Sequence, residues 1–318
     1  MVWRHVMVSL PAVESVSDHV IDRLGRLARG LLAEVELFHC LYDPQLAESA
    51  SAPDREARYA SRIEASRRRL ERIADRLRDQ GLEVRSSVRF DYPIFEAVIR
   101  EVLRQGSDLL IVAAESMGHS GHRALSYSEA RLIEACPCPL LLLKTSEVYS
   151  KGPIVAAVDP MHARAKPAEL DEQIVGAAKT LSGALADAPV HLYHAARPSY
   201  ESASAASYLI GCQQEMRRLA ATHEIPDERV RIQSGPVEAE LPLYARQLRA
   251  DVVVMGAVSR SYAEKALFGH TAERILGALD CDALIIKPKG FRCPVSRRPR
   301  PLSRRTAAAP PGPVAGRP

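Results

Sequence analysis

The chain has 318 residues, of which 47% are hydrophobic and 26% charged. This composition is typical of globular proteins, and the length suggests about two domains. The net charge of +4 comes from seven arginines in residues 291–318, a stretch without acidic residues. Without those seven, 36 basic residues face 39 acidic ones, so the body of the chain lacks the excess positive charge typical of nucleic-acid-binding proteins, and no specific nucleic-acid partner is expected.

Targeting signals are not evident. No apolar run approaches the roughly 20 residues that a membrane helix needs, and the first residues do not resemble a signal peptide. The six cysteines are scattered along the chain, which is typical of reduced thiols rather than of a disulfide framework. We therefore expect a cytoplasmic protein without a membrane partner.

Short apolar runs alternate with helical spacings along the first half. The runs predict strands, and apolar residues recurring every three or four positions predict helices. Strictly alternating elements predict a parallel sheet with helices on both faces. In chain order the expected elements are strand 6–10, helix 13–32, strand 35–40, helix 62–78, strand 84–90, helix 95–105, strand 109–114, helix 128–135 and strand 139–144.

The second half repeats the first. The segment that starts at Asp108 matches the segment that starts at Asp251, and the same offset of 143 residues pairs Cys138 with Cys281. At the first strand the best match has an offset of 149, which aligns Leu10 with Asp159. Matched blocks in the same order indicate a duplication. We therefore predict domains at 1–147 and 152–290, followed by a disordered basic tail rich in proline and arginine at 291–318.

Several stretches resemble the tandem type of the universal stress protein (UspA-domain) family. They are Cys138-Pro-Leu-Leu-Leu-Leu-Lys, Pro93-Ile-Phe-Glu-Ala-Val-Ile-Arg-Glu-Val and Gly269-His-Thr-Ala-Glu-Arg. The resemblance covers the chain to about residue 290. It implies two tandem open, doubly wound parallel-sheet α/β domains of the Rossmann-like, adenine nucleotide alpha hydrolase-like type. It also implies a stress-response binding module, with pairing of the two last strands, 140–143 and 284–286, inside one chain. A homodimer of such chains is equally allowed.

Family members that bind ATP carry a Gly-x-x-Gly-x9-Gly-(Ser/Thr) loop after the fourth strand and an acidic residue after the first. Glycines let backbone N–H groups approach phosphates, and a helix N-terminus adds a positive dipole end. A carboxylate at a strand end can hydrogen-bond the adenine or ribose. The second half keeps the spacing, with Ser259 in place of the second glycine and His270 in place of the usual serine. The resemblance implies weak binding of ATP or another adenine nucleotide by Asp159, Gly256, Ser259, Arg260, Gly269, His270 and Thr271.

The first half has lost this pattern. Leu10 takes the position of the strand-end acid. The loop positions are occupied by Ala113, Ser116 and the pair Ser126-Tyr127. We therefore expect the first domain to bind no nucleotide and to have a structural role.

Two alternatives remain open. One is a structural or partner-binding stress protein without a small ligand, and the other is a nucleotide-hydrolysing or adenylating enzyme on the same fold. The sequence contains no pyrophosphate or Gly-x-x-x-x-Gly-Lys loop, so no catalytic residue is predicted. Cys136-Pro-Cys138 has no second ligand pair nearby, so no metal site is predicted and both thiols are expected to be buried and structural. His39 and His194 lie at equivalent strand ends, where hydrogen-bonded histidines are expected.

Overall fold

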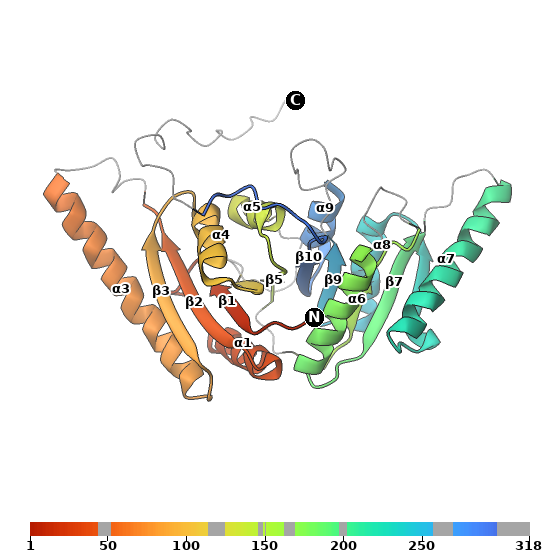
Figure 1. Cartoon of the computed structure of the whole chain (residues 1–318), viewed down its shortest axis with the longest axis horizontal. Coiled ribbons are helices and arrows are strands. Elements are labelled where there is room, and N and C mark those ends of the chain that lie inside the picture. Colours follow the sequence, from red (N-terminus) through yellow and green to blue (C-terminus); the bar gives the residue numbers. More distant parts are fainter. Residues whose placement is uncertain are drawn as a thin grey trace, which may run out of the picture.

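The computed structural model describes residues 1–43, 52–113, 125–145, 149, 151–161, 169–196, 202–256 and 270–297. Strands and helices alternate in both halves (Figure 1). The strands are β1 (His5–Ser9), β2 (Glu34–Leu41), β3 (Val84–Phe90), β4 (Leu109–Ala113), β5 (Leu140–Leu143), β6 (Ile154–Ala157), β7 (Val190–Ala196), β8 (Val230–Ser234), β9 (Val252–Gly256) and β10 (Asp282–Ile286). The helices are α1 (Asp18–Leu31), α3 (Ala52–Arg78), α4 (Ile94–Gln105), α5 (Tyr127–Ala135), α6 (Glu169–Ala184), α7 (Ser202–Thr222), α8 (Val237–Leu248) and α9 (His270–Ala278).

All ten strands belong to one sheet, in the order β3-β2-β1-β4-β5-β10-β9-β6-β7-β8. Within each half the pairs are parallel and the first strand lies between the second and the fourth. This is the predicted doubly wound arrangement, present twice. The parallel pattern is interrupted at one place, because β5 and β10 run antiparallel where the halves meet.

The pairing of β5 with β10 has pseudo-twofold symmetry. Leu140 faces Ile285 and Leu142 faces Ala283, and the offset of 143 residues converts each of these pairs into the other. Leu141 and Leu284 face each other at the centre. Two equivalent strands that pair in this way form an isologous contact, as in a symmetric dimer, but here within one chain.

The strand register corrects the sequence alignment of the first strand by one residue. Val6 pairs with Leu109 in the first half, whereas Ile154 pairs with Val252 in the second. Because positions 109 and 252 are equivalent, the offset at the first strand is 148 and not 149. Pro11, rather than Leu10, is therefore the counterpart of Asp159. The alignment was displaced because it matched two prolines, Pro11 and Pro160, that are not equivalent in space.

Two helical expectations also change at their ends. The helix expected at 13–32 begins only at Asp18, and the helix expected at 62–78 already begins at Ala52. In the second case the polar first turns have no apolar periodicity that could have indicated a helix. None of the helices in the described part of the chain is both long and apolar enough to cross a bilayer.

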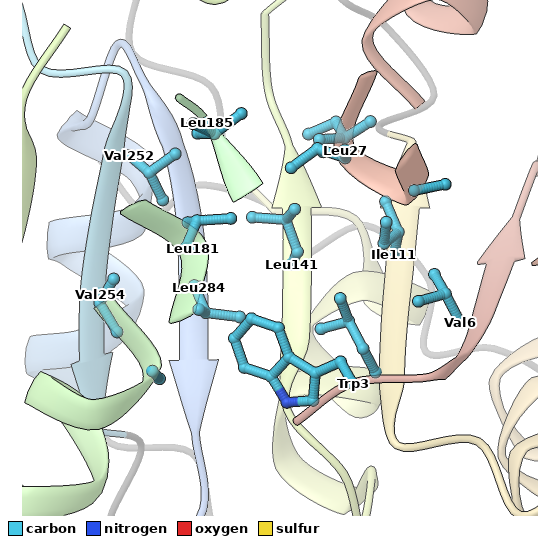
Figure 2. Packing of buried hydrophobic residues seen from close by; sticks show 14 of the residues in the cluster. Trp3, Val6, Leu27, Ile111, Leu141, Leu181, Leu185, Val252, Val254 and Leu284 are labelled. Carbon is cyan, nitrogen blue, oxygen red and sulfur yellow. The ribbon is translucent and has the colours of Figure 1, made fainter. Parts of the chain in front are cut away.

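The core has two layers, one on each face of the sheet. Buried side chains of α1, α3, α6 and α7 form one layer, and those of α4, α5, α8 and α9 form the other. The first layer continues across the junction of the halves. Figure 2 shows Trp3 below Leu141 and beside the Leu284 side chain. Trp3 is buried in this layer, with an exposed fraction of 2%. Trp3 therefore belongs to the apolar layer that spans both last strands, and its fluorescence should report on the junction.

Candidate functional site

The predicted site lies at the carboxyl ends of β6 and β9. These two strands are neighbours, with Ala157 paired to Met255, so Asp159 and Gly256 follow at the same edge of the sheet. In the sheet, β7 lies next to β6 on one side of this pair, and β10 lies next to β9 on the other side. The carboxyl edge at such a change of direction is where open α/β sheets bind ligands.

Asp159 is held by its backbone. Its N–H donates to Asp171 Oδ1 at 3.0 Å, and Asp171 is a buried residue in the first turn of α6. The Asp159 side chain is half-buried, and no hydrogen bond or ion pair to the described residues occupies its carboxylate. The carboxylate is therefore positioned at the sheet edge and available to a ligand. Sequence reasoning missed Asp171, since its role depends on how α6 packs.

Gly256 ends β9 in close contact with α6. A Cβ atom built there would lie 2.8 Å from Leu170 Cδ2 and 3.4 Å from Ile174 Cδ1. The glycine thus lets the first turns of α6 approach the end of the strand. Packing alone is a sufficient reason for a glycine at this position, whatever the loop binds.

The helix that follows the predicted loop is α9. His270 is its first residue, with a fully exposed side chain whose Nδ1 is 3.9 Å from Glu273 Oε2, and Thr271 is the second residue and half-buried. Ser259, Arg260 and Gly269 lie outside the described residues. Of the seven predicted residues, the structure therefore places Asp159 and Gly256 at one edge and His270 and Thr271 at the start of α9.

The equivalent helix of the first half, α5, has an occupied N-terminus. The Ser126 hydroxyl accepts a hydrogen bond from the Glu129 N–H at 3.2 Å, and the Glu129 carboxylate accepts one from the Ser126 N–H at 2.7 Å. This reciprocal capping box occupies the N–H groups of Ser126 and Glu129 and places a buried carboxylate at the helix start, where a phosphate would bind. The sequence analysis missed this capping box, although the Ser-x-x-Glu spacing could have indicated it.

The second half has no such carboxylate at the equivalent position. The offset of 143 residues that relates β4 to β9 places Gly269 at the position of Ser126 and Ala272 at that of Glu129. Glu273 follows one residue later and lies beside His270. The capping box is therefore specific to the first half.

Both strand-end histidines form the expected hydrogen bonds to backbone carbonyls. His39 Nδ1 lies 2.6 Å from the Leu10 carbonyl oxygen, and His194 Nδ1 lies 3.1 Å from that of Val158. In the second half, His194 Nε2 is also 3.6 Å from Cys212 Sγ, a pair that only the tertiary structure brings together. Cys212 is fully buried, and this burial raises the pKa of its thiol. The pair therefore has the contacts of a core hydrogen bond rather than of an activated nucleophile.

The described residues contain no group of three His, Cys, Asp or Glu side chains that could hold a metal ion. They do line a cleft of about 320 Å³ beside the junction of the halves, which includes Arg23, Tyr149, Arg246 and Arg249. This cleft lies near the amino ends of β9 and β10, at the opposite edge of the sheet from Asp159.

Comparison with known proteins gives consistent results. The model of the universal stress protein family matches residues 10–144 and again residues 153–287. Universal stress protein E of Photorhabdus laumondii is 27% identical over 68% of this chain and 73% of its own length. The protein of the same name from Escherichia coli K12 is 28% identical over 63% of this chain and 67% of its own length.

Solved structures extend the similarity to nearly the whole fold. A functionally unknown protein from Pseudomonas aeruginosa PAO1 superposes with a TM-score of 0.71 at 25% identity, over 90% of this chain and 93% of that one. A universal stress protein from Archaeoglobus fulgidus has the same fold with a TM-score of 0.66 at 14% identity, over 89% of this chain and 98% of that one. The family model matches both halves, and each half has the same five-stranded doubly wound sheet. The chain belongs to the universal stress protein family and carries two domains of that family in tandem.

Proposed function

We propose that this chain is a stress-response binding protein whose second domain, residues 152–290, binds an adenine nucleotide, and whose first domain binds none. The phosphates would lie at the N-terminus of α9, with Ser259, Arg260 and Gly269 of the preceding loop around them. Asp159, at the adjoining strand end, would accept hydrogen bonds from the adenine or ribose. The proposed role is binding, because the histidine and the thiol near Asp159, His194 and Cys212, are engaged in hydrogen bonds within the core.

The contrast between α5 and α9 carries this proposal. Backbone N–H groups at a helix N-terminus favour one anion, either a side-chain carboxylate or a ligand phosphate. In α5 that anion is Glu129, whereas α9 has Ala272 at the same position. The two duplicated domains therefore differ in the side chain that would compete with a phosphate for the N-terminus of this helix.

The position of Asp159 supports the same domain. In the first half Pro11 takes the equivalent place and brings neither a carboxylate nor an N–H. Both differences between the halves, at the strand end and at the helix start, favour a ligand in the second half. Because two glycine-loop identities are replaced, we expect the affinity to be weak.

The test is to measure nucleotide binding in the full chain and in Ala272→Glu. This substitution transfers the first half's own residue to the second half, so the fold should tolerate it. Native mass spectrometry and an acid extract of the purified protein should recover about one adenine nucleotide per chain, or ATP should raise Tm. At a concentration one hundred times Kd, the gain in unfolding free energy is about 2.7 kcal/mol. Ala272→Glu should abolish this gain.

Glu129→Ala in α5 is the matched control, and it should leave the bound nucleotide unchanged. Undiminished binding in Ala272→Glu would show that α9 does not hold the phosphates. If the unaltered chain retains no nucleotide and millimolar ATP does not change Tm, the proposal is wrong, and a ligand-free, partner-binding role replaces it.

A further inference from the structure

Cys136 and Cys138 bring two thiols together at the end of α5. Cys136 is the residue that caps this helix, and Cys138 lies two residues later, before β5. Their Sγ atoms are 3.6 Å apart, and the exposed fractions are 0% and 8%. A disulfide bond needs a sulfur separation of about 2.05 Å, so a movement of about 1.5 Å would join them. The pair is buried as expected, but its geometry is that of a dithiol rather than of two independent thiols.

A cation from the other half lies beside this dithiol. Lys287, which follows β10, donates from Nζ to the Glu134 carbonyl oxygen at 3.1 Å, near the end of α5. The Cys138 S–H, then the Cys138 backbone N–H and last the Lys287 charge lower the pKa of Cys136, whereas burial raises it. Burial lowers the pKa of Lys287 to about 8, so the ammonium form still predominates at neutral pH. The surroundings thus favour thiolate on Cys136, with Cys138 as the thiol that donates to it.

The chain after β10 covers this region. Figure 1 shows the dark-blue segment that follows β10 crossing over α5 toward α4. Lys287 Nζ lies 4.7 Å from the centre of the Phe291 ring. Cys293 and Val295 pack on the same apolar layer as Cys136. The covering segment belongs to the second half and the dithiol to the first.

The second half has no counterpart to this dithiol. Leu279 takes the position of Cys136, and Cys281 takes that of Cys138. Burial raises the pKa of the Cys281 thiol to about 12. One molecule therefore contains a paired thiol and an equivalent single thiol, which serves as an internal control.

We propose that Cys136 and Cys138 form a redox-active dithiol that hydrogen peroxide converts into a disulfide. The Cys136 thiolate attacks one peroxide oxygen, the O–O bond breaks, and the departing hydroxide takes a proton and leaves as water. The Cys138 sulfur then attacks the Cys136 sulfenic acid, and the S–O bond breaks as the S–S bond forms. The Cys138 proton leaves with the hydroxide as a second water. In sum, two thiols and one peroxide give one disulfide and two waters, and the sulfur atoms supply the two electrons.

The experiment treats the full, reduced chain with hydrogen peroxide at pH 7, then blocks the remaining thiols under denaturing conditions and identifies them by mass spectrometry. The tryptic peptide 132–144 contains both thiols and no other cysteine, and the peptide 275–289 contains Cys281 alone. We expect the first peptide to become unlabelled and lighter by two hydrogens, at least tenfold faster than Cys281 loses its label. Full labelling of the first peptide while Cys281 is oxidised would overturn the proposal.

Three variants test the assigned roles. Cys138→Ser should stop the reaction at a Cys136 sulfenic acid, which dimedone traps. Cys136→Leu, which introduces the residue of the second half, should slow the oxidation of Cys138 to the rate of Cys281. Lys287→Met should slow disulfide formation several-fold. If Cys138 reacts equally fast without Cys136, the dithiol is not the reactive unit and the proposal is wrong.

Discussion

Replacing Asp282 by alanine should destabilise the whole chain, because its carboxylate joins the two halves through buried partners. This carboxylate accepts hydrogen bonds from the Tyr149 hydroxyl at 2.7 Å and from the Lys144 backbone N–H at 2.8 Å. It also forms an ion pair with Arg23 of α1, and the exposed fraction of both side chains is 1%. The Arg23 guanidinium lies 4.4 Å from the centre of the Tyr149 ring. The first half, the connection and the second half therefore meet at one carboxylate.

The size of the effect follows from what remains after the substitution. Arg23 keeps its hydrogen bond to the Thr145 carbonyl oxygen but loses its counter-ion in a buried position. Removing one partner of a buried ion pair costs about 3–5 kcal/mol. With an unfolding entropy of about 2.1 cal/mol/K per residue over roughly 290 residues, Tm should fall by about 5–8 °C.

Urea unfolding measures this cost, followed by far-UV circular dichroism and by the fluorescence of Trp3, the only tryptophan. Arg23→Met should cost about as much as Asp282→Ala. The double variant should lose about 1–3 kcal/mol less than the sum, because no unpaired charge remains. Asp18→Ala, which breaks an exposed ion pair with Arg76, is the control and should change stability by about 0.5 kcal/mol or less. If Asp282→Ala costs under about 1 kcal/mol, or if the single effects simply add, the reasoning is refuted.

Three further predictions concern the core. Burial lowers the pKa of His39 below its usual 6.5. The contribution of His39 to stability should therefore be full above pH 6.5 and decrease below it, by up to about 1.4 kcal/mol per pH unit. In His39→Asn the difference in Tm between pH 7 and pH 5 should be smaller than in the unaltered chain, and an equal difference would contradict this assignment. Gly30→Ala places a Cβ 2.0 Å from the backbone oxygen of Ala184 in α6 and should lower the free energy of unfolding in urea by about 1–3 kcal/mol. Gly176→Ala, which has open space around it, should instead stabilise α6 by up to about 1 kcal/mol. Aspartate at both Leu142 and Ile285 would bury two charges at the junction of the halves and should yield insoluble protein or a much lower Tm; a soluble variant with unchanged Tm would show that this junction does not stabilise the fold.

Much of the architecture could be predicted from local patterns. Apolar runs of strand length and helical spacings gave the order of the elements, and the repeated segments indicated two copies of one domain. These features depend on neighbours within a few residues or on the similarity of two segments, so one sequence is enough to detect them. The candidate ligand residue Asp159 and the loop spacing from Gly256 to Thr271 were accessible for the same reason.

The one-residue error at the first strand shows where such reasoning stops. Leu10 and Pro11 are both compatible with the end of a strand, and the sequence offers no measure of which one lies opposite the partner strand. Hydrogen bonding between β1 and β4 decides this. Because successive side chains of a strand point to opposite faces, a shift by one residue changes which side chain reaches the site.

By itself, the sequence determined the fold class and the duplication, and it indicated Asp159 as a candidate ligand residue. Only the tertiary structure decided that the Glu129 carboxylate accepts a hydrogen bond from the Ser126 N–H at the start of α5. It also decided that Lys287 lies beside the two thiols, 153 residues from its hydrogen-bond partner Glu134, and that Arg23 meets Asp282 across 259 residues. Such contacts are set by how whole helices and strands pack, and their energies depend on burial and distance, which local sequence patterns do not contain.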